Sequence, residues 1–176
     1  MDSVEHKGLV AALAVAAIAA ASTDIAQTPI PPSAKDFAMT AAQSDQYEIS
    51  AAQDALAQSQ NPQVRAFARE MIQDHTRLSE GLRQAATASG RKPPPPAMSS
   101  DQAAMLSALQ SLRGADFDKA YARQQILAHQ AALDVEHSFA DGGTDPNLRR
   151  AAQSSLPTIQ HHLDMAQQLK AALGDS

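Results

Sequence analysis

Residues 61–75 of the chain read NPQVRAFAREMIQDH, and they carry both the start signal and the inward face of a helix. Asn61 is a favoured N-cap residue, and Pro62 takes the first helical position, where its missing N–H costs nothing. Apolar side chains then recur every three or four residues, which is the period of an amphipathic helix. The stripe consists of Val64, Phe67, Met71, His75, Leu78 and Leu82. This pattern predicts a helix from Pro62 to about Ala88.

The same start signal occurs a second time, at Asp145-Pro146, after the helix-ending pair Gly142-Gly143. The sequence NPQVR at 61–65 resembles DPNLR at 145–149, which indicates a duplicated pair of helices. Periodic apolar residues predict one further helix before each of these turns. The four long helices are expected at residues 35–59, 62–88, 115–140 and 146–173. We therefore predict an all-α fold, an antiparallel four-helix bundle.

The segment between the second and third long helices begins with Gly90 and the run Pro93 to Pro96, which cannot join a helix. A short extra helix is expected within this connector, at about residues 101–112. The connector is long enough to run from one end of the bundle to the other. Both a crossover topology and a simple up-down topology therefore agree with the sequence.

The N-terminal residues predict export. Residues 9–21 form an uncharged apolar run that is short for a membrane span and ends in small residues. We expect residues 1–21 to be a signal peptide, 22–34 a flexible leader and 35–174 the bundle. We then expect the mature chain to have no transmembrane span and to lie in the periplasm, either free or associated with the outer membrane. The alternative is that the apolar run anchors the chain in a membrane.

Composition limits the chemistry that this chain can perform. Apolar residues make up 44% of it but aromatic residues only 3%, so the core must rely on close approach of alanine-rich helices. The formal net charge is −5 without a basic block, and we therefore expect no nucleic-acid partner. The chain has no cysteine, which excludes disulfides and thiolate metal sites. Histidine and carboxylate side chains remain as metal ligands.

Each long helix places one such side chain on its inward stripe. These candidate ligands are Glu48, His75, His129 and His162. Two antiparallel helices that meet at a turn bring residues equally far from the turn to the same height. Glu48 lies 14 residues before Pro62 and His75 lies 13 after it. His129 and His162 lie 17 residues before and 16 after Pro146, so each pair of helices places its two candidates at one height. One carboxylate and three imidazoles suit a single transition-metal ion, namely zinc, iron, manganese or copper.

Four other side chains are expected around such a site, as residues that orient the ligands. They are Asp74, Tyr47, Tyr121 and Glu136. The alternative is a metal-free polar network that fixes the register of the helices, in which case the chain is a structural or interaction protein. A third reading is a metal-dependent redox enzyme with an open ligand position. No glycine-rich phosphate loop or nucleophile elbow is present, and we favour a binding role over catalysis.

Three sequence runs resemble a known family of exported bacterial proteins. They are Met71-Ile72-Gln73-Asp74-His75, Phe117-Asp118-Lys119-Ala120-Tyr121 with His129, and Leu156-Pro157 with His162-Leu163. Together they resemble the domain-of-unknown-function family numbered four-one-four-two, whose members are often labelled predicted outer-membrane proteins. The likeness extends over about residues 35–173.

This resemblance implies a ferritin-like bundle of the bacterial envelope with no established activity. It places five residues of this chain on recurrent polar positions of the family, namely Glu48, Asp74, His75, His129 and His162. Ferritin-like di-iron proteins carry a Glu-x-x-His pair on two helices. Here Ile72 and Ile159 stand three residues before His75 and His162. We therefore expect a mononuclear site rather than a di-iron centre.

Overall fold

The computed structural model describes residues 31–174, and all regular structure in this range is helical. The expected signal peptide and the first part of the expected leader lie outside the described residues. The helices are α1 (Ala34–Gln58), α2 (Pro62–Ala88), α3 (Ser100–Gln110), α4 (Gly114–Gly142) and α5 (Pro146–Leu173). The all-α bundle and its short extra helix are confirmed.

Helices α2 and α5 begin where their capping residues predict. The Asn61 side chain accepts hydrogen bonds from the backbone N–H groups of Gln63 and Val64, at 2.8 and 3.3 Å. Asp145 does the same at the start of α5, for Asn147 and Leu148. These bonds satisfy N–H groups that the first turn of a helix leaves without a partner.

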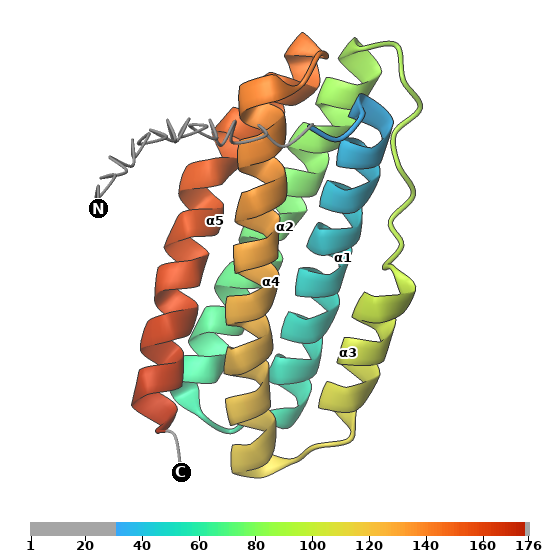
Figure 1. Ribbon diagram of the computed structural model, residues 1–176. Coiled ribbons are helices and arrows are strands. Elements are labelled where there is room, and N and C mark those ends of the chain that lie inside the picture. Colours follow the sequence, from blue (N-terminus) through green and yellow to red (C-terminus); the bar gives the residue numbers. More distant parts are fainter. Residues whose placement is uncertain (1–30, 175–176) are drawn as a thin grey trace, which may run out of the picture.

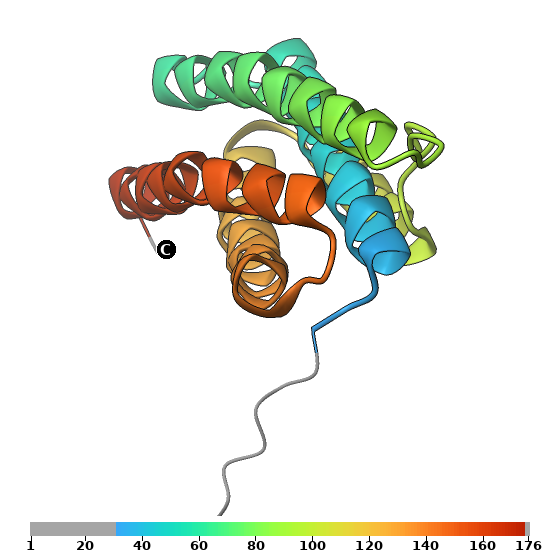
Figure 2. The ribbon, with the colours of Figure 1, turned by 90° about the horizontal axis from the view of Figure 1, so that it is seen from above.

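The connector between α2 and α4 runs along the whole length of the bundle. Helix α2 ends at the top of Figure 1, and the connector then runs down beside α1, through α3, so that α4 starts at the bottom. As a result α1 packs against α2 and α4, and α5 packs against α4 and α2. The same arrangement is seen end-on in Figure 2. This is the crossover topology of ferritin-like bundles, which the sequence alone left open beside an up-down arrangement.

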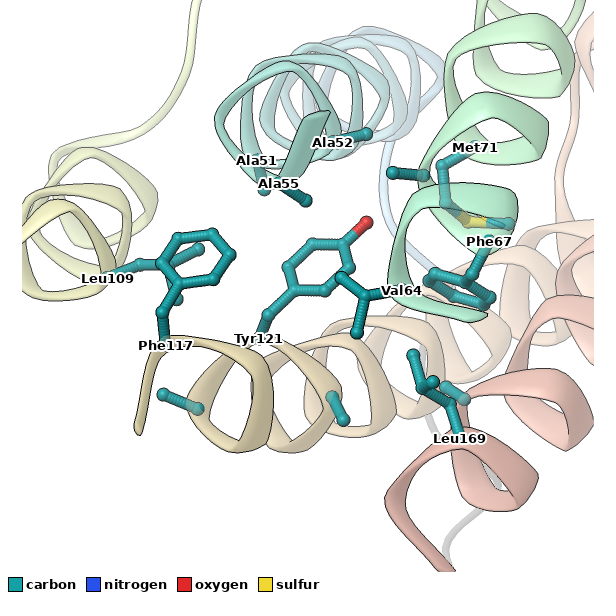
Figure 3. Close-up of a cluster of buried hydrophobic side chains, with 14 of the residues drawn as sticks. Ala51, Ala52, Ala55, Val64, Phe67, Met71, Leu109, Phe117, Tyr121 and Leu169 are labelled. Carbon is teal, nitrogen blue, oxygen red and sulfur yellow. The ribbon is translucent and has the colours of Figure 1, made fainter. Parts of the chain in front are cut away.

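Two apolar clusters fill the two ends of the bundle. The lower cluster packs around Tyr121, which projects from α4 into the space between α1 and α2 (Figure 3). Ala51, Ala52 and Ala55 are fully buried there, so α1 comes close to its neighbours, as the composition predicts. The upper cluster contains the stacked rings of Phe37 and Phe139. A layer of buried polar side chains lies between the two clusters.

The helices present no membrane-spanning candidate within residues 31–174, because none combines sufficient length with sufficient apolar character.

Gly81 is an exposed residue in the middle of α2. We expect Gly81→Ala to raise the free energy of unfolding by about 1 kcal/mol, because glycine is a poor residue for a helix interior and an added Cβ meets no atom within 4 Å. Urea denaturation measures this gain. Gly143→Ala is the contrasting variant, since its Cβ would lie 2.5 Å from the Phe139 carbonyl oxygen, and it should lose stability. A loss for Gly81→Ala would contradict the assignment of this position as open helix.

Candidate metal centre

Three histidines from three helices meet in the polar layer. His75 of α2, His129 of α4 and His162 of α5 are exposed by only 2%, 1% and 0%. Their ring centroids lie 5.2 to 5.5 Å apart in all three pairs, so the rings form a nearly equilateral triangle. Each ring offers one nitrogen within 4.8 Å of the nitrogens of the other two. The structure therefore brings together three of the four residues that the inward stripes single out as ligands.

The second nitrogen of each ring is held by a hydrogen-bond partner outside the triangle. The Nδ1 of His75 lies 2.9 Å from an Asp45 carboxylate oxygen. The Nδ1 of His129 lies 2.8 Å from the backbone carbonyl oxygen of Gln125. The Nε2 of His162 lies 3.0 Å from a carboxylate oxygen of Asp74.

These anchors decide which nitrogens face the interior of the triangle. For His75 and His129 it is Nε2, and these two atoms lie 3.4 Å apart. For His162 we infer that it is Nδ1, because Nε2 contacts Asp74 and Nδ1 is a buried atom with no hydrogen-bond partner among the described residues. Anchoring one imidazole nitrogen on an acceptor fixes the tautomer and leaves the other nitrogen as a lone-pair donor, which is how metal-binding histidines are usually held.

Asp45 was missed by the sequence analysis. It is buried, and its second carboxylate oxygen accepts a hydrogen bond from the Ser79 hydroxyl at 2.9 Å. A sequence signal for it does exist, because Asp45 lies three residues before Glu48 and so shares the inward face of α1. Its contact with His75 depends on the packing of α1 against α2, which the sequence does not give.

Burial and neighbouring charges set the protonation of the three rings. Burial, together with the charge of His75, lowers the pKa of His129 to about 3 and the pKa of His162 to about 4. Burial also acts to lower the pKa of His75, but the hydrogen bond to Asp45 and the nearby carboxylates outweigh it, and this pKa is raised overall. His129 and His162 are therefore neutral at pH 7, as metal ligands must be.

Glu48 lies beside the triangle rather than within it. One of its carboxylate oxygens is 3.8 Å from the Nδ1 of His129, which is the anchored side of that ring. Neither oxygen has a hydrogen-bond partner among residues 31–174. Burial raises the pKa of Glu48 to about 7, and the nearby charge of His75 offsets only part of this effect. Its assignment as a ligand stays a prediction.

The four residues expected around the ligands lie in different places. Asp74 contacts His162, as described above, and not its sequence neighbour His75. The Tyr47 hydroxyl donates to Gln124 at 2.8 Å, whereas the buried Tyr121 hydroxyl has no partner among the described residues. Both tyrosines lie close enough to Glu48 for its charge to raise their pKa values further, after the larger effect of burial.

Glu136 lies about two turns after His129 on α4, where it accepts a hydrogen bond from the Ser155 hydroxyl at 2.9 Å. Burial raises its pKa to about 7. It lines a cavity of about 90 Å³ together with His75 and Asp45. Asp45 and Glu136 also line a larger groove, of about 480 Å³, between α2 and α5. Asp45 and Glu136 therefore place one edge of the polar layer beside both cavities, and His75 borders the smaller one.

The chain resembles known proteins in sequence and in fold. Residues 19–169 match the family model described as Domain of unknown function (DUF4142). A solved structure, described as CopM in the Cu(II)-bound form, superposes with a TM-score of 0.69 at 19% sequence identity, covering 82% of this chain and 99% of that one. At this identity the likeness concerns the fold. No curated protein matches the chain. Because the family model spans most of the sequence, the chain belongs to the DUF4142 family.

Proposed function

We propose that this bundle binds one transition-metal ion on the Nε2 atoms of His75 and His129 and the Nδ1 of His162. The observation that carries the proposal is that each ring directs one nitrogen toward the other two rings, while its second nitrogen contacts a hydrogen-bond acceptor outside the triangle. A buried histidine without a ligand needs hydrogen bonds to satisfy its polar atoms, yet the inward nitrogen of His162 has none within the described residues. A bound cation would supply the missing partner.

Copper is the first choice of metal and zinc the second. Three imidazole ligands, with His75 giving up its proton when the ion binds, suit both ions better than they suit manganese, which prefers oxygen ligands. Copper(II) also has the highest affinity of the divalent first-row ions for a given set of nitrogen ligands. The copper-bound state of CopM, which shares the fold, agrees with this choice. Iron is the remaining metal of the set that the sequence suggests.

Glu48 remains part of the proposal as a nearby carboxylate. Its position beside the Nδ1 of His129 lets it stabilise positive charge on that ring when the ion binds. Direct ligation requires Glu48 or the ring of His129 to turn, because the carboxylate faces the anchored nitrogen. In that case Glu48→Gln would lower copper affinity strongly, whereas a charge-stabilising role predicts a smaller loss.

The proposed role is metal handling outside the cytoplasm, in the bacterial envelope. The apolar run at residues 9–21 supports export, because its length and small-residue ending are typical of a signal peptide. Association with the outer membrane belongs to the same proposal. N-terminal sequencing of protein recovered from the envelope tests this part, and a mature chain that begins near Ser22 is expected.

A metal-free structural role is the second candidate. It is favoured by the anchors themselves, because the contacts of Asp45 with His75 and of Asp74 with His162 join neighbouring helices without any ion. Such buried polar contacts can fix helix register. In that case the protein as isolated would carry no metal and would not respond to it.

Elemental analysis of protein purified from the envelope without chelators separates the two candidates. We expect about one copper or zinc ion per wild-type chain, and none in His162→Leu, because that change removes a converging nitrogen. His137→Leu is the matched control, since His137 is an exposed histidine of α4 and the variant should keep the ion. Metal-free wild-type protein that also fails to take up added copper or zinc would reject metal binding.

A further inference from the structure

A second group of ligand-type side chains lies between the three-histidine site and the protein surface. Ligand atoms of Glu70, Asp74 and His162 lie within 4.8 Å of one another. Glu70 and Asp74 are one turn apart on α2, so they share a face of that helix, and His162 reaches them from α5. The Nε2 of His162 contacts Asp74 in this group, whereas its unpartnered Nδ1 faces the inner triangle. One imidazole therefore belongs to both groups.

These side chains form a graded path from solvent to the core. His161 is 62% exposed and lies 3.4 Å from Glu70, which is 38% exposed, and Asp74 is 14% exposed. His162, at the end of the path, is fully buried. An ion that reaches the inner triangle must lose its water ligands, and replacing them stepwise by carboxylate oxygens and imidazole nitrogens avoids a fully uncompensated charge in the interior.

We propose that Glu70, Asp74 and the Nε2 of His162 form an outer site that takes up a divalent transition-metal ion before it moves to the inner three-histidine site. The inference rests on the proposed function, because it assigns the entry route for the same ion. The neutral ring of His162 carries a proton on one of its nitrogens, so it serves either the outer or the inner site at one time. The two sites therefore fill in succession rather than together.

Asp74 also makes a hydrogen bond with Arg77, which is two-thirds exposed. This cation partly neutralises the outer site and keeps it weaker than the inner one. A weak outer site suits a loading role, because an ion held tightly there would not move inward. Among residues 31–174, the basic side chain in contact with Glu70 is the imidazole of His161, 3.4 Å from its carboxylate oxygen.

Stopped-flow loading with Cu(II) tests the outer site. Metal-free full chain is mixed with limiting Cu(II), and copper absorbance reports uptake; release is followed after a chelator is added. We expect Glu70→Gln to slow both uptake and release about tenfold, because a residue on the path affects both directions. The matched control is Glu80→Gln, which removes the same charge from an exposed position of α2 and should leave both rates unchanged.

A second arm uses His129→Leu, which removes an inner ligand and leaves the outer group complete. This variant should still bind one Cu(II), more weakly than wild type does, and adding Glu70→Gln should abolish that binding. Unchanged uptake and release in Glu70→Gln, with one ion bound tightly to wild type, would overturn the outer site alone. Wild-type chain that binds no copper at all would overturn both the outer site and the proposed function.

Discussion

Copper(II) at about 100 times its dissociation constant is expected to raise the free energy of unfolding of the wild-type protein by about 2.7 kcal/mol. A ligand that binds only the folded state stabilises it by mass action, and the three converging nitrogens exist only in the folded bundle. For a domain of this size the gain corresponds to a rise in melting temperature of about 5–10 °C. Thermal unfolding with copper, and again with excess chelator, measures it.

His129→Leu is the variant that tests this expectation most cleanly. Its anchored nitrogen hydrogen-bonds the Gln125 carbonyl oxygen of the preceding turn and only approaches Glu48, at 3.8 Å, so the substitution breaks no hydrogen bond to a carboxylate. We expect its metal-free stability to be close to that of wild type, and the gain at the same copper concentration to be much smaller, because only the weaker outer site remains. His75→Leu should reduce the copper-induced gain in the same way, but it should also lower metal-free stability, because it removes the imidazole partner of the buried Asp45.

The exposed His137 provides the control here too, since His137→Leu should keep the full copper effect. Equal melting temperatures of the wild type with chelator and with copper, zinc, iron or manganese would reject the site. The structural candidate would then account for the polar layer.

Glu48→Gln is expected to stabilise the metal-free protein at high pH and to have no comparable effect at low pH. Burial raises the pKa of Glu48 from 4.5 to about 7, so the folded protein holds a proton there that the unfolded chain has already lost. A raised folded-state pKa means that wild-type stability is fully present below pH 4.5 and falls as pH rises toward 7. Over this window the loss amounts to about 3 kcal/mol.

Glutamine cannot ionise, so the variant escapes this loss. The difference in the free energy of unfolding between Glu48→Gln and wild type should therefore grow by about 3 kcal/mol between pH 4.5 and pH 8. Urea denaturation in the presence of chelator, repeated across this pH range, measures the difference. Glu136→Gln should show the same trend, because burial raises the pKa of Glu136 to about 7 as well. The exposed Glu80→Gln should show none, and a pH-independent difference for Glu48→Gln would contradict the assigned burial.

The fold was predictable because its signals are local. Asn61-Pro62 and Asp145-Pro146 cap their helices through bonds to residues two and three positions away, so the sequence located both helix starts at the correct residue. The crossover was not predictable in this way. It depends on whether α2 packs against α4 or against α5, and that is decided by the whole bundle surface rather than by any turn.

The candidate site was predictable in part for the same reason. Helical spacing places His75, His129 and His162 on inward stripes, and the structure buries all three. Which nitrogen of each ring faces inward depends on acceptors from other parts of the fold. Asp45 and Asp74 provide two of these acceptors, and the pairing of Asp74 with His162, 88 residues away, cannot be read from one helix.

The division of the three histidines between the two hairpins has a kinetic consequence. His75 belongs to the α1–α2 hairpin, and His129 and His162 belong to the α4–α5 hairpin, with the long connector between them. Each hairpin is built from contacts near in sequence and can form early in folding, whereas the complete ligand set appears only after the hairpins dock. A bound ion must therefore leave, or lose a ligand, before the hairpins separate. An ion bound to all three histidines would therefore slow unfolding and leave the first steps of folding unaffected.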